Sequence, residues 1–188
     1  MRTWPEMIER HEQGVRDIKI YSGMAQAFPE QYYTSALNME FALMAMAEQW
    51  AQARSKSPRS KVGAVLYCTR TGMMSFGYNG LPAGMPDLKA TWDNLDPQDP
   101  QNLYNLVQHA EMNCIRKAWQ CSELFDFPHS ILCTTLYPCH HCMKDFIVPS
   151  GCKTVWFRDY HHSHDHEAKQ ASQVLADAAG IRLRQLGA

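Results

Sequence analysis

The sequence predicts an α/β fold, built mainly from one domain in which strands alternate with helices. The chain of 188 residues is long enough for one domain of ordinary size with a buried core. Hydrophobic residues make up 45% of it and charged residues 20%, which excludes a disordered or fibrous protein. Short apolar runs of strand length alternate with segments of helical periodicity, and this alternation indicates the α/β class.

The first 36 residues are polar and weakly patterned, so we interpret 1–36 as an N-terminal extension and expect the domain over 37–188. Thr34 and Ser35 favour a helix N-terminus, and helical periodicity follows them. The apolar face of this helix is expected to pack in the core and consists of Leu43, Met46, Ala47 and Trp50.

Two strands joined by a tight turn are predicted next. The apolar run 62–68 has strand character, Gly72 suits a hairpin turn, and the chain is expected to return over about 73–78. This returning strand ends in the stretch GYNGLPAGMPD, whose glycines and prolines are expected to exclude regular structure. Residues 81–104 therefore form a predicted long loop, which we interpret as a lid or an interface.

The second half of the chain alternates helices with strands. The predicted helices cover about 106–119, 139–148 and 167–179. The predicted strands cover 130–135, 154–157 and, after a helix-ending Gly180, 181–186.

Charge and hydropathy exclude several classes of function. Eighteen Lys and Arg against nineteen Asp and Glu give a net charge of -1, so no general basic field attracts duplex nucleic acid. No run approaches the ~18 apolar residues that a membrane span needs, and the start of the chain is charged, so a soluble cytoplasmic protein is expected. Seven cysteines in such a protein favour metal binding over a disulfide framework.

The sharpest chemical signal combines H-A-E at 109–111 with P-C-x-x-C at 138–142. Cys139 and Cys142 are spaced so that two thiolates reach one ion, and His109 adds an imidazole. Three such ligands suit tetrahedral zinc with a fourth position open to water. Glu111 is then the candidate general base, and this pair of motifs is the signature of zinc nucleobase deaminases.

Two other interpretations of these motifs stay open at this point. A structural zinc site would leave Glu111 as a surface acid and take its fourth ligand from Cys114, His140 or His141. A redox C-x-x-C like that of thioredoxin would make the H-A-E motif coincidental. The remaining cysteines lack ligand spacing and are expected to be mostly buried thiols: Cys68, Cys114, Cys121, Cys133 and Cys152.

Two further clusters of polar residues stand out. The histidines within 161–166 could bind a second metal or form a solvated loop. A basic loop directly precedes V-G-A, and it either is solvated or contacts a phosphate; its charged residues are Arg54, Lys56, Arg59 and Lys61.

From about residue 41 to 185 the sequence resembles the deoxycytidylate deaminase family within the cytidine deaminase superfamily. The resemblance is carried by RSKSPRSKVGAV, GYNGLPAG, HAEMNCI, TLYPCHHC and a tail in which Tyr160-His161 precedes a helix and AGI. The sequence departs from the family pattern in its long N-terminus, an inserted residue in the histidine-rich loop, Ser57 and Cys114.

The resemblance implies a cytidine-deaminase-like three-layer fold, with a central mixed five-stranded sheet and helices on both faces, assembled as a homohexamer. It implies that zinc is held by His109, Cys139 and Cys142 and that Glu111 is the catalytic proton shuttle. Glu111 would move a proton from water to N3 of the cytosine of dCMP and then to the departing amine. The products would be ammonia and dUMP, which supplies thymidylate synthesis.

The resemblance also implies contacts with the nucleotide. Asn79 is expected to bind the deoxyribose, and the backbone around Gly63 and Ala64 to lie against the base. The phosphate is expected to face Tyr160 together with Arg54, Ser55 or Lys56. In this family dCTP with Mg²⁺ activates and dTTP inhibits, at a loop that corresponds here to the one with Gly80 and Gly84.

Two alternative functions follow from the same residues. A broader deaminase would also accept dCTP or 5-modified dCMP. A non-catalytic, zinc-stabilised interaction module would need four protein ligands and would tolerate changes at Glu111. Editing of nucleic acids is disfavoured by the neutral net charge and by the lack of a basic stripe with interleaved aromatic residues.

Overall fold

The computed structural model describes residues 37–58, 60–88, 91–92, 106–160 and 166–186. The expected extension 1–36, most of the loop predicted at 81–104, and histidines 161, 162 and 164 lie outside the described residues. Backbone contacts divide the chain into Met1–Asn38 and Met39–Ala188, and the fold below is that of the second unit. Among the helices that the structure describes, none combines the length and the apolar composition that would let it cross a membrane.

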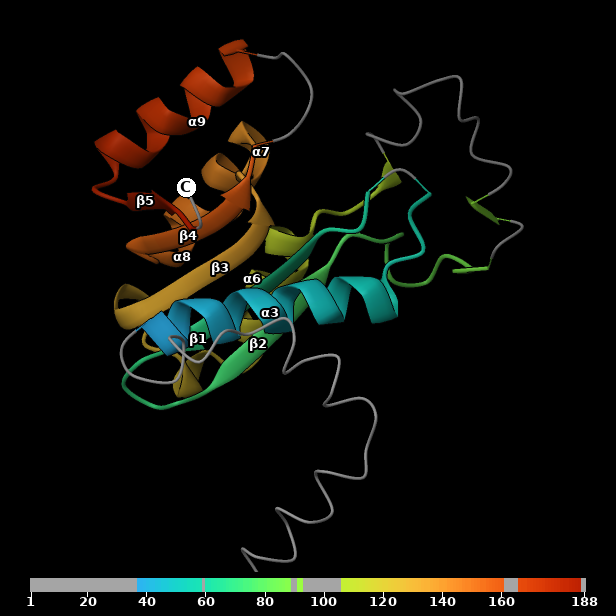
Figure 1. The fold of residues 1–188 in the computed structure, drawn as a ribbon, viewed down its shortest axis with the longest axis horizontal. Coiled ribbons are helices and arrows are strands. Elements are labelled where there is room, and N and C mark those ends of the chain that lie inside the picture. The colour runs from blue at the N-terminus through green and yellow to red at the C-terminus, as the bar shows by residue number, and fades with distance from the viewer. Residues whose placement is uncertain (1–36, 59, 89–90, 93–105, 161–165, 187–188) are drawn as a thin grey trace, which may run out of the picture. The chain divides into compact units, whose positions relative to one another are not determined.

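One mixed sheet of five strands forms the centre of the fold, in the order β2-β1-β3-β4-β5 (Figure 1). β1 is antiparallel to both β2 and β3, whereas β3, β4 and β5 are parallel to one another. The predicted α/β class and five-stranded mixed sheet are confirmed. The strands are β1 (Gly63–Cys68), β2 (Met74–Tyr78), β3 (Ser130–Leu136), β4 (Thr154–Asp159) and β5 (Arg182–Gln185).

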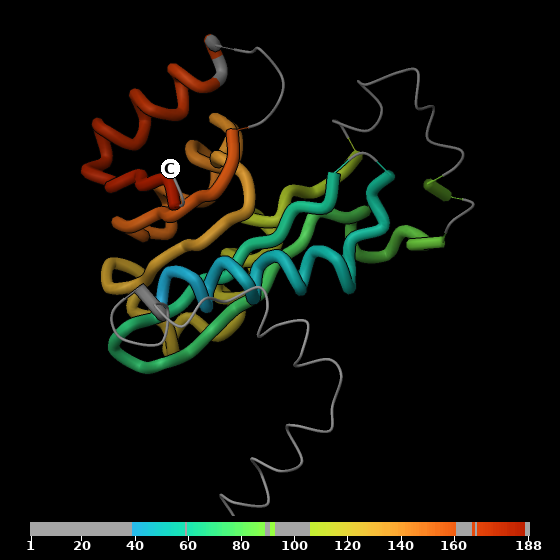
Figure 2. Tube along the Cα trace, viewed as in Figure 1, coloured from blue at the N-terminus to red at the C-terminus, as the bar shows by residue number. Residues whose placement is uncertain are grey.

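Helices cover both faces of this sheet, which gives three layers (Figures 1 and 2). Successive residues of β1 point to opposite faces: Val65 packs with α3, whereas Ala64 and Leu66 pack with α6. Of the helices that the structure describes, α3 packs on the first face and the others pack on the second. The helical elements are α3 (Leu37–Arg54), α6 (Ala110–Trp119), α7 (His140–Cys142), the π-helical η4 (Met143–Ile147), α8 (Val148–Ser150) and α9 (His166–Ala178).

The buried face of α3 is rotated about the helix axis relative to the predicted one. Leu43 and Ala47 are buried as expected, but Met46 is 39% exposed and Met44 is buried in its place. The reason is a close approach to β1. A Cβ atom on Gly63 would lie 1.9 Å from the carbonyl oxygen of Ala47, so the missing side chain sets which side of α3 meets the sheet.

α6 begins four residues later than predicted, at Ala110 rather than near residue 106. Gln108 pairs with Gly80 through two backbone hydrogen bonds of 2.8 and 3.1 Å, which hold this stretch in an extended conformation. His109 is also extended, with φ −74° and ψ 156°, and is the N-cap of the helix. The pairing partner lies 28 positions away in the sequence, so helical periodicity could not reveal it.

The helical segment after β3 agrees with the prediction for 139–148 and continues to Ser150, where Gly151 (φ 82°) ends it. The last helix and strand are also confirmed: α9 precedes Gly180 (φ 64°), and β5 is shorter than the predicted 181–186. The hairpin turn at Gly72 has φ 75°, as a turn glycine requires. The short 3₁₀ helices η2 (Ser122–Leu124) and η3 (Phe127–His129) were not anticipated.

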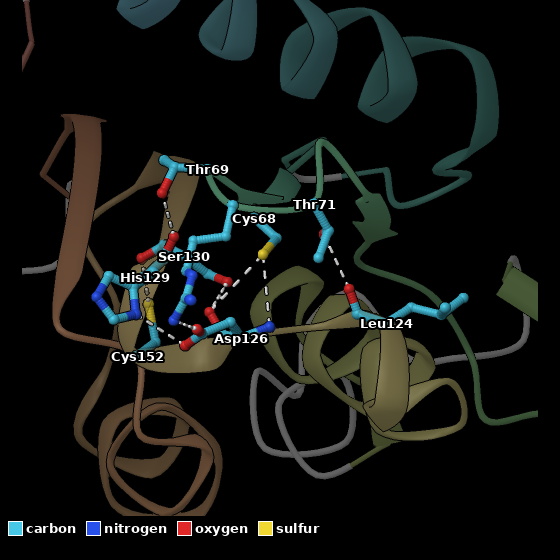
Figure 3. Close-up of polar contacts among 9 residues, drawn as sticks. Cys68, Thr69, Thr71, Leu124, Asp126, His129, Ser130 and Cys152 are labelled. Atoms are coloured by element: carbon cyan, nitrogen blue, oxygen red, sulfur yellow. Dashed lines mark hydrogen bonds and ion pairs between the residues drawn. The ribbon is translucent and has the colours of Figure 1, made fainter.

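Side chains of the β1–β2 hairpin bind the segment that leads into β3 (Figure 3). The Thr69 hydroxyl donates to the carbonyl oxygen of His129 at 2.7 Å, and the Thr71 hydroxyl donates to that of Leu124 at 2.9 Å. These bonds anchor the start of β3. Because β3 runs from there toward Cys139, they help to hold the strand that delivers the C-x-x-C motif.

The cysteines outside the C-x-x-C motif are mostly buried thiols, as predicted. Cys152 donates to the carbonyl oxygen of Ser130, the first residue of β3, at 3.3 Å (Figure 3). Cys121 is exposed. The buried members of this group are Cys68, Cys114, Cys133 and Cys152.

Gly77 in β2 allows α6 to lie directly on the sheet. A Cβ atom there would lie 2.0 Å from the carbonyl oxygen of Ala110 and 2.6 Å from the nitrogen of Cys114. We expect Gly77→Ala to lower the free energy of unfolding by about 3 kcal/mol, the upper end of ordinary overpacking, because backbone must move. Unfolding by denaturant measures this change in the free energy of unfolding.

Gly80→Ala is the matched control for this prediction. Its Cβ atom would meet only the ring of Tyr78, at 3.1 Å, and a side chain can yield more easily than backbone. Equal stabilities of Gly77→Ala and Gly80→Ala would contradict the close docking of α6.

Candidate metal and catalytic site

His109 and Cys139 each occupy the residue just before a helical segment. Both are N-caps with extended backbone, at ψ 156° for His109 and ψ 164° for Cys139. The backbone N–H of Cys142 donates to the Cys139 sulfur at 3.5 Å. Two helical N-termini therefore meet here, and their positive ends favour thiolate anions.

The three predicted ligand side chains converge. Nδ1 of His109 lies 3.3 Å from the Cys139 sulfur and 3.4 Å from the Cys142 sulfur. All three ligand atoms lie within 4.8 Å of one another. A tetrahedral zinc ion with ordinary bond lengths would hold such sulfur and nitrogen atoms about 3.5 Å apart, so the donor set fits this metal.

The electrostatics of the cluster also suit a cation. A hydrogen bond from Cys142 and the adjacent His109 hold the pKa of Cys139 well below its usual range. The hydrogen bond with Cys139 and burial raise the pKa of Cys142, and the hydrogen bond with Cys139 raises the pKa of His109 to about 9. A divalent metal bound by these three residues would favour the thiolate form of Cys142 and the neutral imidazole of His109.

Glu111 lies beside this cluster in a buried position. It is only 3% exposed, and its Oε2 accepts from the Cys142 thiol at 3.7 Å. Burial raises the pKa of Glu111 to about 7, so the carboxyl group can both take up and release a proton near neutral pH. A cation bound by the cluster would lower this pKa.

The residues suggested as a fourth ligand do not join the group. Within the described residues, the set with metal-binding geometry contains only His109, Cys139 and Cys142. Cys114 instead donates to the carbonyl oxygen of Ser75 at 3.2 Å. The His140 ring stacks on His141, with ring centroids 4.0 Å apart. Three protein ligands favour a catalytic site over a structural one.

The residues expected to lie against the base are at the start of β1. The N–H of Gly63 donates to the hydroxyl of Thr135 at 3.1 Å, and Ala64 is fully buried between Gly77 and Thr134 of the neighbouring strands. Contact of this backbone with a base stays a prediction.

Asn79 and Ser55, expected at the sugar and the phosphate, are both buried and bind each other. The Ser55 hydroxyl donates to Oδ1 of Asn79, 2.7 Å away, with the main-chain oxygen of Asn79 2.9 Å away. Ser55 therefore faces Asn79, and its contact with a phosphate stays a prediction.

Three other side chains were expected to face the phosphate. Arg54 lies over the rings of Trp50 and Tyr78, at 5.9 and 5.8 Å. Lys56 forms an ion pair with Asp87 at 3.0 Å. Tyr160, 45% exposed, packs against the ring of Tyr137 at a centroid distance of 5.2 Å. No contact among the described residues brings these three side chains together around one point, and their role stays a prediction.

The two glycines of the expected effector loop differ. The N–H of Gly80 already donates to Gln108, whereas Gly84 has φ 96° and open space around it. Residues 81–88 form neither helix nor strand, as predicted. Binding of a triphosphate at this loop stays a prediction.

Two positions that hold the site were missed by sequence reasoning. Asn113 donates to the carbonyl oxygen of Tyr78 at 2.9 Å and so ties α6 to the end of β2. Its position four residues after His109, on the same side of the helix, was the available signal. Gly77, a glycine inside a strand, was the signal for the close approach of α6.

Comparison with known proteins finds similarity to deaminases of cytidine and deoxycytidylate. The family described as the cytidine and deoxycytidylate deaminase zinc-binding region matches residues 38–158, which include the three ligand residues and Glu111. The probable deoxycytidylate deaminase of Caenorhabditis elegans is 37% identical over 136 residues, which cover 71% of this chain and 62% of the nematode protein, less than two thirds of it. The deoxycytidylate deaminase of Homo sapiens is 32% identical over 142 residues, 76% of each chain.

A solved structure is similar as well. The dCMP deaminase of the cyanophage S-TIM5, in complex with dCMP and dUMP, aligns with a TM-score of 0.59 and 26% sequence identity. The alignment covers 82% of this chain and 100% of the phage chain.

Proposed function

Because this chain belongs to the deoxycytidylate deaminase family, we propose that it hydrolyses dCMP to dUMP and ammonia. The single observation that carries this proposal is the cluster of His109, Cys139 and Cys142 with the buried carboxyl group of Glu111 beside it. A similar protein was solved with dCMP and dUMP, which supports both substrate and product.

Zinc is the metal that these ligands fit, with two sulfurs and one imidazole nitrogen as donors. When bound, it would supply a Lewis acid that lowers the pKa of a water molecule. Cys139 and Cys142, at the N-terminus of a helical segment, would hold it as thiolates, and their two negative charges would balance its charge.

Glu111 is the group that moves protons in the proposed reaction. It would accept a proton from water and give it to N3 of the cytosine ring, while the oxygen forms a bond with C4. The remaining proton of that water, now on the C4 hydroxyl, would then pass through Glu111 to the exocyclic amine. The bond between C4 and that nitrogen would break, and the C4 carbonyl of dUMP would form. One water is consumed and one ammonia is released. The product dUMP is the precursor that thymidylate synthesis uses.

The proposal predicts a preference for a 5′-phosphate and for a 2′-deoxyribose. We expect kcat/KM for dCMP to exceed that for deoxycytidine by about 10- to 100-fold, because one charge-assisted hydrogen bond to a phosphate contributes roughly 1.5–3 kcal/mol. Ammonia release with dCMP, CMP and deoxycytidine measures this.

Equal values of kcat/KM for dCMP and deoxycytidine would contradict the preference. The same assay with dCTP and 5-methyl-dCMP distinguishes the narrow enzyme from a broader nucleotide deaminase.

A further inference from the structure

Ser55 and Asn79 form a buried pair between the end of α3 and the end of β2. They are 3% and 6% exposed. The N–H of Ser55 donates to the carbonyl oxygen of Ala51 at 2.9 Å, so the last turn of α3 fixes where Ser55 lies. Its hydroxyl reaches both the side-chain oxygen and the main-chain oxygen of Asn79, and thus holds the amide against its own backbone.

Two more contacts determine which way the Asn79 amide faces. Oδ1 accepts from the N–H of Val62 at 2.8 Å, and Nδ2 donates to the carbonyl oxygen of Ser60 at 2.9 Å. The reversed amide would turn its NH₂ group toward a donor and its oxygen toward an acceptor, so only one orientation is chemically satisfied.

The contacts among the described residues leave one hydrogen-bonding group of Asn79 to a ligand. An amide has two acceptor lone pairs and two N–H donors. Ser55 and Val62 use the lone pairs, and Ser60 uses one N–H. What Asn79 can offer is therefore a single donor, which suits an acceptor oxygen on the ligand.

The backbone that carries Asn79 is tied by hydrogen bonds to α6 and to the segment that precedes it. Gly80, the next residue, pairs with Gln108, which directly precedes the ligand residue His109. Tyr78, the preceding residue, accepts a hydrogen bond from Asn113 of α6. Backbone on both sides of Asn79 is thus fastened to the segment that carries the site.

We propose that Ser55 is a positioning residue that orients the amide of Asn79 toward the sugar of the nucleotide, rather than a phosphate contact. The inference rests on the proposed function. The 3′-hydroxyl is the one hydroxyl group of the deoxyribose in dCMP, and its oxygen is the acceptor that the remaining N–H of Asn79 suits. Without Ser55, Oδ1 keeps Val62, but the amide is less restrained and presents its N–H less often.

The test compares two substrates that differ only in this oxygen, dCMP and 2′,3′-dideoxycytidylate, with the full-length zinc-loaded protein. We expect Ser55→Ala to lower kcat/KM for dCMP by about 3- to 10-fold, the range for one neutral hydrogen bond, mainly through KM. We expect kcat/KM for the dideoxy substrate to be unchanged, because that substrate has no oxygen for Asn79 to bind.

Three variants complete the experiment. Ser55→Thr keeps the hydroxyl and should restore the wild-type ratio between the two substrates. Ser57→Ala is the matched control, since only the backbone N–H of Ser57 contacts Ser55, and it should leave the ratio unchanged. Ser55→Cys nearly keeps the side-chain volume and replaces a strong donor by a weak one, so it gives the same readout if Ser55→Ala does not fold.

An equal loss of kcat/KM for both substrates would show that Ser55 only supports the fold, and would overturn the inference. A wild-type protein that does not distinguish the two substrates would overturn it as well. If the wild-type protein releases no ammonia from dCMP, the proposed function fails instead, so the two failures are distinguishable.

Discussion

Replacing Glu111 with glutamine is expected to lower kcat for dCMP by about 100- to 10,000-fold, the range for a general acid–base group, while the protein keeps its metal. The amide has nearly the same shape as the carboxyl group, but it cannot take up and release a proton. Because Glu111 is 3% exposed, bulk water is poorly placed to replace it. Glu111 is not one of the ligand residues, so the metal should stay bound.

Ammonia release and metal content, measured on the same preparation, test this result. Glu123→Gln is the matched control, because Glu123 is an exposed acid in η2. Near-normal turnover of Glu111→Gln would refute a catalytic role for Glu111.

Removal of one ligand sulfur should have the second large effect. We expect Cys142→Ala to lose both the bound zinc, from about one per chain, and the deaminase activity, because two remaining ligands neither balance the charge nor complete the geometry. Cys142 also contacts Glu111, so the carboxyl group would lose a neighbour as well.

Metal analysis after dialysis, together with the rate of ammonia release, measures this loss. Cys121→Ala removes an exposed thiol outside the cluster and should change neither quantity. Full zinc occupancy in Cys142→Ala would mean that other residues hold the zinc, and would contradict the assignment of Cys142 as a ligand.

The sequence alone predicted that His109, Cys139 and Cys142 converge, and it predicted the order of the strands and helices along the chain. These features depend on short-range spacing. Cys139 and Cys142 are three residues apart, so local backbone geometry brings this pair together wherever the segment lies. The terminating glycines Gly151 and Gly180 act in the same local way, through a positive φ.

The rotation of α3 and the start of α6 were decided by the tertiary structure. Met46 fits the helical period as well as Met44 does, and only the contact of Ala47 with Gly63 determines which of them is buried. Leu106 is helical, as its sequence predicts, but the pairing of Gln108 with Gly80 separates it from α6, which starts at Ala110.

The tertiary structure also decided the surroundings of Ser55 and Asn79. In the sequence, Ser55 belongs to a basic loop and suggests a phosphate contact, whereas in the fold its hydroxyl is buried against Asn79, 24 positions away. Such a contact depends on how α3, β1 and β2 pack together. No local pattern records that packing, because a hydrogen bond between distant segments forms only after the backbone has brought them within about 3 Å.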